Sequence, residues 1–69
     1  MTFDEYMNKT HSINEQLQDI ATRTKNLALL GQANASNSNF ANLMRLHANL
    51  TEQSRKMTED MMNQLQIDN

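Results

Sequence analysis

One stretch of the chain, from Thr2 to Leu30, keeps a single unbroken hydrophobic period and constrains the fold more than any other feature. Its apolar and threonine side chains recur at steps of three and four residues, the spacing of positions a and d in a heptad repeat. This spacing places them all on one narrow stripe of an α-helix, which must be buried against another element. The stripe consists of Phe3, Tyr6, Thr10, Ile13, Leu17, Ile20, Thr24 and Leu27.

Both ends of this first helix carry residues that start and stop helices. Thr2 followed by Glu5 forms a capping-box pair. Gly31, directly after Leu30, suits the left-handed conformation in which helices commonly end. We therefore predict a first helix over about residues 3–30.

The next segment, residues 31–38, is rich in asparagine and serine, whose side chains compete for backbone hydrogen bonds and favour turns and N-caps. We predict a loop there, with Asn37 or Ser38 capping a second helix over about residues 39–66. The register also indicates a break, because the a positions of the first stripe, continued through Gly31, would fall next at Ser38, whereas the second stripe starts at Phe40. A coiled coil tolerates insertions of three or four residues, and a shift of two does not fit either.

The second helix carries its own stripe, which consists of Phe40, Leu43, His47, Leu50, Ser54, Met57 and Met61. If the chain turns near Ala35, Ile20 meets Leu50 and Leu27 meets Leu43. Apolar layers of one helix then coincide with apolar layers of the other, which neither helix requires by itself. We therefore predict an all-α fold in which residues 1–69 form a single antiparallel two-helix hairpin.

A chain of 69 residues without cysteine has few ways to become stable. A core of this size supplies only ~3–5 kcal/mol, and disulfides and thiolate metal sites are excluded. Burying one leucine or methionine is worth ~1.5–3 kcal/mol, so several left in water are a large loss. We predict that two hairpins dimerise into a four-helix bundle with coiled-coil-like packing. The apolar residues flanking the stripes are Ala28, Leu29, Leu30, Met44 and Leu46 near the loop, and Met7, Met62, Leu65 and Ile67 near the termini.

The net charge of −2 and the hydropathy pattern limit the cellular compartments and the kinds of partner that we expect. No apolar run approaches the ~18 residues that a membrane span needs. Asp4 and Glu5 make the N-terminus unlike a signal peptide. We therefore expect a soluble cytoplasmic protein that does not act on a membrane.

Each residue that could serve as a metal ligand or a catalytic group has a commoner structural role. His11 and Glu15 lie one turn apart, and a hairpin could bring Glu59 close enough to complete a metal site, but a solvated pair at i, i+4 is far commoner. His47 falls on the apolar stripe, where we expect a neighbour such as Thr24 to satisfy its imidazole. The chain shows no nucleophile–base arrangement and no glycine-rich loop. We therefore predict that it is not an enzyme and has no cofactor, catalytic residue or metal ligand.

The leading functional hypothesis is a small non-enzymatic protein–protein interaction module, such as an assembly factor, adaptor or inhibitor. It would act through apolar helix surface, and its partner would be a second copy, another protein, or both. Short hairpins with this heptad pattern resemble secretion-system co-chaperones, small phage-encoded regulators and inhibitors, and plasmid-borne bundle proteins in size and pattern. The predicted partner-binding residues are Ala28, Leu29, Leu30, Met44, Arg45 and Leu46.

Two alternatives remain open. One is a dimeric nucleic-acid-binding regulator that uses a basic patch of Arg23, Lys25 and Arg45, although three cations without interleaved aromatic residues are a weak signal. The other is a structural subunit of a phage or secretion-type assembly. The charge could instead orient self-assembly, because the basic loop end of one hairpin would favour the acidic end of an antiparallel neighbour. That acidic end carries Asp4, Glu5, Glu59, Asp60 and Asp68.

Overall fold

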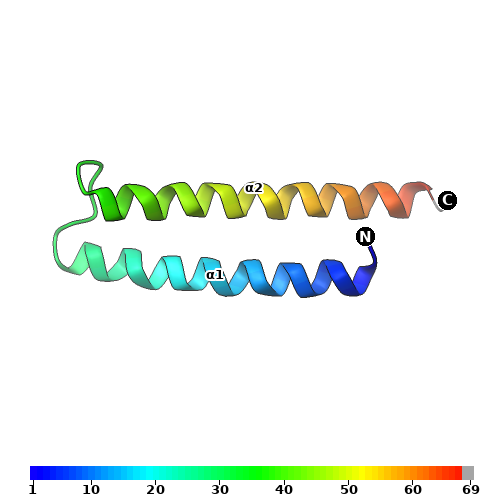
Figure 1. The fold of residues 1–69 in the computed structure, drawn as a ribbon, viewed down its shortest axis with the longest axis horizontal. Coiled ribbons are helices and arrows are strands. Elements are labelled where there is room, and N and C mark those ends of the chain that lie inside the picture. The colour runs from blue at the N-terminus through cyan, green and yellow to red at the C-terminus, as the bar shows by residue number, and fades with distance from the viewer. Residues whose placement is uncertain (68–69) are drawn as a thin grey trace.

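The computed structural model describes residues 1–67, which form two helices, α1 (Phe3–Leu29) and α2 (Ser38–Ile67). The helices lie side by side and antiparallel, joined by one loop, so the N-terminus lies beside the last turns of α2 (Figure 1). The predicted all-α hairpin is therefore confirmed. Asp68, which the sequence places at the acidic end, lies outside the described residues.

The start of α1 is fixed by the predicted capping pair. Thr2 has extended backbone angles, and its Oγ1 accepts a hydrogen bond of 3.1 Å from the Glu5 N–H. The same hydroxyl donates to the Glu5 carboxylate at 3.2 Å. Because the first N–H groups of a helix lack intrahelical partners, this side-chain acceptor stabilises the first turn.

The end of α1 is closed by Gly31, which has a φ of +72°. The Gly31 N–H donates to the Ala28 carbonyl at 3.0 Å, and the Gln32 N–H donates to the Leu27 carbonyl at 2.8 Å. These two bonds form a Schellman motif, which glycine favours because it pays no Cβ penalty at positive φ. The predicted C-terminal glycine is confirmed.

Asn37 caps α2, because its Oδ1 accepts a hydrogen bond of 3.0 Å from the Phe40 N–H. Between the helices, Asn34 Oδ1 accepts hydrogen bonds from the N–H and the hydroxyl of Ser36, at 3.2 and 2.5 Å. Asparagine thus forms the turn and the cap, as its side chain favours. The midpoint between the end of α1 and the start of α2 falls at residues 33–34, so the chain turns slightly before the predicted Ala35.

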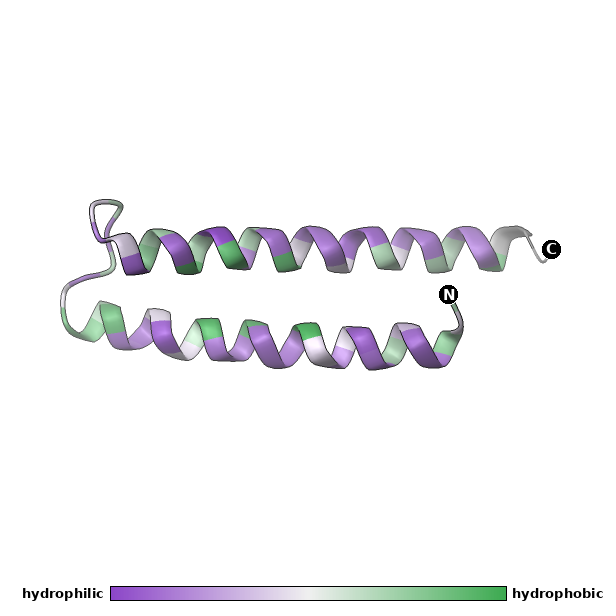
Figure 2. Cartoon of the chain, viewed as in Figure 1, coloured by the Kyte–Doolittle hydropathy of each residue, from purple (hydrophilic) through white to green (hydrophobic). Residues whose placement is uncertain are grey.

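The core is a short apolar cluster midway along the two helices. Ile13, Ile20 and Leu50 are buried there. Ile20 and Leu50 therefore meet as predicted, and Leu27 and Leu43 line one cleft nearer the loop. Figure 2 shows apolar bands on the facing sides of the helices, and a further one at the end of α1 beside the loop. The side chains that pack against the cluster are Leu17, Leu43 and Met57.

One predicted pairing differs from the structure. His47 is exposed, and within the described residues the buried Thr24 hydroxyl has no hydrogen-bond partner, so the predicted bond between the two is not formed. We call the line of contact between α1 and α2 the seam. Because only two helices form it, one side of each a position stays open to water, and a polar imidazole can reach that water readily. At the other end, the Tyr6 hydroxyl lies 3.0 Å from that of Thr58.

The hairpin is long and thin, with a length of 52 Å. Its radius of gyration is 15.7 Å, against about 11 Å for a compact domain of this length. So elongated a shape buries little: among the described residues, four hydrophobic side chains are buried, namely Ile13, Ile20, Leu50 and Met61. Neither helix in residues 1–67 has a stretch long and apolar enough to cross a membrane.

Candidate interaction surface

Large apolar side chains remain exposed at both ends of the hairpin and not in its middle. Between Ile13 and Ile20 on α1 the apolar side chains turn inward. Toward the loop, by contrast, Leu29 and Leu30 are 76% and 71% exposed. The exposed set among the described residues is Leu29, Leu30, Met44 and Leu46 at the loop end, and Met1, Phe3, Met7, Met62 and Leu65 at the terminal end.

The hairpin has two flanks, because the g positions of both helices lie along one side of the seam and the e positions along the other. We call the first side the asparagine flank. Helical geometry and three open clefts define it, and it comprises Gln16, Arg23, Asn26 and Leu30 of α1 with Asn39, Asn42, Leu46 and Asn49 of α2.

Two of the clefts of the asparagine flank have apolar floors and polar rims. The larger, about 450 Å³, lies at the loop end, and its floor includes Leu27 and Leu43. The smaller, about 270 Å³, has Ile20 and Leu50 at its floor. On the rim, Arg23 Nε donates to Asp19 Oδ2 at 3.0 Å, so this cation is already paired. The two clefts bring Leu30 and Leu46 to the same side of the hairpin.

We call the opposite side the methionine flank. It is less polar than the asparagine flank, chiefly on α2. Its e positions are Met7, Asn14, Ala21 and Ala28 of α1 and Met44, Thr51, Thr58 and Leu65 of α2. The adjoining b positions of α2 include Ala48 and Met62 besides Arg55, whereas those of α1 are polar or charged: Asp4, His11, Gln18 and Lys25. The hydrogen bond between Tyr6 and Thr58 crosses the seam on this side.

The structure does not bring the six predicted partner-binding residues onto one face. Leu30 and Leu46 lie on the asparagine flank, whereas Ala28 and Met44 lie on the methionine flank. Leu29 and Arg45 fall at the outer positions of α1 and α2. Consecutive helical residues are about 100° apart, so a patch continuous in the sequence is spread around the helix.

The three residues of the predicted basic patch are also separated. Arg23 is paired with Asp19 on the asparagine flank. Arg45 donates to the Asn42 Oδ1 at 3.3 Å. Lys25 follows Arg23 by two residues and so points about 160° away from it.

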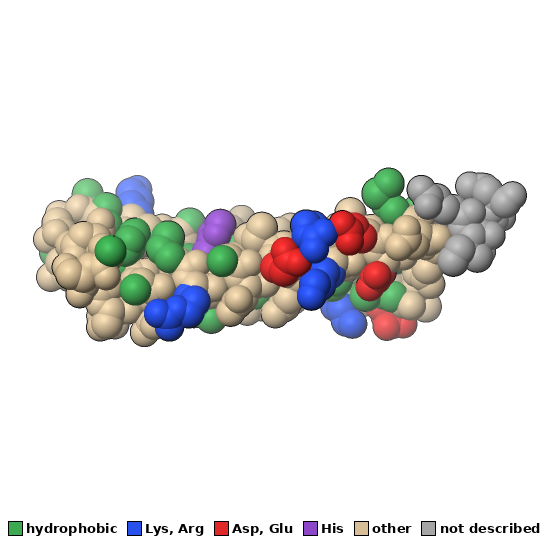
Figure 3. Space-filling model, turned by 90° about the horizontal axis from the view of Figure 1, so that it is seen from above, with side chains coloured by type: hydrophobic (Ala, Val, Ile, Leu, Met, Phe, Trp, Pro, Cys, Tyr) green, Lys and Arg blue, Asp and Glu red, His purple; other side chains and the backbone are tan. Residues whose placement is uncertain are grey.

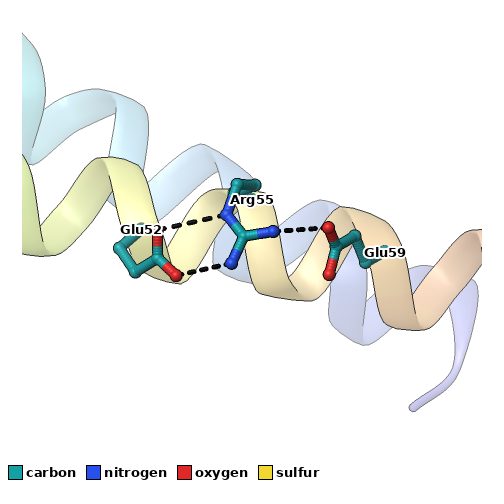
Figure 4. Close-up of polar contacts among 3 residues, drawn as sticks. All are labelled: Glu52, Arg55 and Glu59. Atoms are coloured by element: carbon teal, nitrogen blue, oxygen red, sulfur yellow. Dashed lines mark hydrogen bonds and ion pairs between the residues drawn. The ribbon is translucent and has the colours of Figure 1, made fainter.

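The outer side of α2 is marked by a charged cluster centred on Arg55 (Figure 4). Its Nε and a terminal nitrogen donate to the Glu52 carboxylate at 3.1 and 2.6 Å, and the other terminal nitrogen pairs with Glu59. The hydrogen bond from Arg55 lowers the pKa of Glu52, and the bond to Glu52 raises the pKa of Arg55. Figure 3 shows charged side chains gathered in this region and apolar ones nearer the loop end. This side of α2 is suited to water.

His11 and Glu15 form the simple pair that helical spacing favours. His11 Nε2 lies 3.0 Å from Glu15 Oε1, and both side chains are exposed. Glu59, the third ligand considered, pairs with Arg55 instead. Within residues 1–67, no three histidine, cysteine or acidic side chains are grouped so as to hold a metal ion.

Comparison with models of known families, with characterised proteins and with solved structures finds no match to this chain. Its function is therefore inferred from its own surface. Met7 and Met62 stand out in the sequence as apolar, but their grouping with Ala21 and Ala48 on one flank is a feature that the predicted residues missed. The heptad letters of these four residues, e and b, were the signal for that grouping.

Proposed function

We propose that this chain is a small, non-enzymatic protein–protein interaction module. Its apolar helix surface is covered by a partner, and that partner is a second copy, giving a four-helix bundle. The observation that carries the proposal is the set of nine large hydrophobic side chains exposed on a hairpin that buries only four among its described residues. Exposed apolar patches at both ends of so small a domain favour an interaction site over a solvated face.

The amount of exposed surface fits a second copy. The chain exposes 5311 Å², whereas a compact monomer of 8.0 kDa exposes about 4,450 Å². The excess, roughly 860 Å², is close to the ~800 Å² that each partner contributes to an interface of standard size. Packing two such hairpins together at ordinary crossing angles would remove an area of this order.

The test is sedimentation equilibrium of the purified chain, with circular dichroism over the same dilution series. We expect a mass of twice 8.0 kDa at micromolar concentration and a loss of helix signal as the dimer dissociates. A folded chain that sediments at 8.0 kDa at every concentration would contradict the proposed self-association. That result would favour a different protein as the occupant of the same apolar surface.

The two other candidate functions have distinct signatures in the same preparation. A nucleic-acid binder would be retained on heparin with a steep salt dependence, because binding to phosphates releases counterions. The separation of Arg23, Lys25 and Arg45 around the hairpin gives this reading less support. A structural subunit would form rings or filaments rather than a closed dimer, since its interfaces would be heterologous.

A further inference from the structure

The two flanks differ in how much apolar surface they leave exposed. On or beside the methionine flank lie five of the nine exposed large hydrophobic side chains, against two on the asparagine flank. Those five are Phe3, Met7, Met44, Met62 and Leu65. A second copy would therefore bury the most apolar area by docking on the methionine flank.

The asparagine flank is also costlier to bury. Four asparagine amides lie on it, against one, that of Asn14, on the methionine flank, and a buried amide left without partners costs ~1–3 kcal/mol. The Arg23–Asp19 ion pair on the same side would lose its hydration as well. The amides concerned belong to Asn26, Asn39, Asn42 and Asn49.

Side-chain size along the methionine flank indicates the orientation of the second copy. Toward the termini the flank carries long side chains, among them Met7 and Met62. Toward the loop it carries three alanines, Ala21, Ala28 and Ala48, together with Met44. Facing helices pack best when large residues oppose small ones. An antiparallel arrangement places Met7 of one copy over Ala28 of the other, whereas a parallel one opposes the long side chains of the two terminal halves.

Charge indicates the same orientation. The loop half, residues 17–51, has a formal charge of +2 from Arg23, Lys25 and Arg45 against Asp19. The terminal half, residues 1–16 and 52–67, has −3 from six acidic and three basic side chains. An antiparallel pair brings opposite halves together, which favours the correct register, while a parallel pair brings like halves together. The six acidic residues are Asp4, Glu5, Glu15, Glu52, Glu59 and Asp60, and the three basic ones are Lys9, Arg55 and Lys56.

We infer that a second copy of this chain docks on the methionine flank in antiparallel orientation, with the loop half of each hairpin against the terminal half of the other. This inference rests on the proposed self-association and adds the face and the direction. The contact is isologous: the same flank serves both copies, and the two-fold axis passes near the middle of the flank. The asparagine flank, with its clefts, stays in water.

Orientation is tested by cross-linking, since the chain has no native cysteine. Met7→Cys and Ala28→Cys are prepared singly, and each is treated with a short bis-maleimide alone and in an equimolar mixture. We expect cross-linked dimer only from the mixture, because residue 7 of one copy then lies near residue 28 of the other. Cross-linking of each single variant with itself would show a parallel dimer and overturn the orientation.

The face is tested by two neighbouring substitutions on α1. Ala21→Glu puts a charge on the methionine flank, and Thr22→Glu puts the same charge on the outer side, at an equal distance from the loop. We expect Ala21→Glu to raise the dimer dissociation constant at least tenfold and Thr22→Glu to change it less than threefold. A second control, Leu30→Gln with Leu46→Gln on the asparagine flank, should leave the dimer intact.

The outcomes separate this inference from the proposed function. A wild-type chain that stays monomeric contradicts self-association itself. A dimer that is insensitive to Ala21→Glu but lost in the Leu30/Leu46 variant keeps self-association and contradicts the assigned face. Circular dichroism of each variant at high concentration checks that the helices still form.

Discussion

The middle of the hairpin and its two ends follow the same heptad pattern but reach different degrees of burial. In the middle, Ile13, Ile20 and Leu50 are buried, and polar residues flank the seam. At the ends, apolar residues occupy the flanks as well as the seam, so leucines such as Leu29 and Leu30 stay exposed. The middle therefore has the residue pattern of an interface between two helices only, and the ends have the pattern of helices in a larger bundle.

Two half-buried threonines of α1 mark the boundaries of the middle. Thr10 and Thr24 lie on either side of the core isoleucines, and within the described residues neither buried hydroxyl has a hydrogen-bond partner. An unpartnered buried hydroxyl costs ~1–3 kcal/mol, so each of these layers weakens the seam. Outside them, two helices alone do not provide enough cover for the apolar side chains.

The largest effect is expected where the middle is broken. Ile20 is 5% exposed, and Ile20→Ala should lower the free energy of unfolding by about 2–4 kcal/mol through lost transfer energy and the cavity left behind. This is most of the ~3–5 kcal/mol that a core of this size supplies. Thermal denaturation followed at 222 nm measures the loss. The Leu29 side chain is 76% exposed, so Leu29→Ala should change the free energy of unfolding by less than about 0.5 kcal/mol. A loss equal to that of Ile20→Ala would contradict the distinction between middle and end.

A smaller effect is expected at the backbone that closes the loop end. Gly31 has a φ of +72°, and nothing lies within 4 Å of an added Cβ, so Gly31→Ala tests the backbone conformation alone. We expect a loss of about 1–2 kcal/mol, the usual cost of the left-handed conformation. Urea denaturation compares it with Gln32→Ala, an exposed neighbour that should be nearly neutral. A neutral Gly31→Ala would mean that the Schellman motif does not hold the loop.

The two N-caps allow the ends to be compared directly. Asn37→Ala removes the acceptor for the Phe40 N–H at the closed loop end and should cost about 1 kcal/mol. Thr2→Ala removes the equivalent acceptor at the open terminal end, where fraying spares part of the cost, so we expect a smaller loss. Melting temperatures measured in parallel decide the order, and a larger loss for Thr2→Ala would reverse the expected ranking of the two ends.

The smallest effect concerns the charged outer side of the middle. Since Arg55 lowers the pKa of Glu52 below its ordinary value of 4.5, the pair stabilises the folded chain above that pH. The contribution is lost as the pH falls through the lowered pKa. We expect the wild-type melting temperature to drop slightly more than that of Arg55→Gln between pH 6 and pH 3. The difference should shrink in high salt because the cluster is exposed, and a difference that salt leaves unchanged would argue against an exposed pair.

Much of the fold was predictable because its signals are local. Thr2, Gly31 and Asn37 each act through hydrogen bonds within a few residues, and the stripe containing Ile20 and Leu50 has one consistent period. The exposure of His47 was not predictable in this way. Burial at a seam depends on how both helices are rotated, which a stripe read on one helix does not specify.

The interaction surface was predicted less well than the fold. Residues 28–30 and 44–46 were grouped because they are close in the sequence and near the loop. On the structure Leu30 and Leu46 lie on one flank and Ala28 and Met44 on the other, since neighbours on a helix diverge by about 100°. Whether any of these residues binds a partner stays a prediction.

Native-state hydrogen exchange over a dilution series tests most directly whether the middle holds itself while the ends need a second copy. The free energy of opening a segment determines how strongly its amides are protected from exchange. The account predicts that amides near Ala28, Met44 and Met62 lose protection as the chain is diluted below its dissociation constant, while those of Ile20 and Leu50 keep theirs. Protection that is the same at the ends and in the middle, and unchanged by dilution, would contradict it.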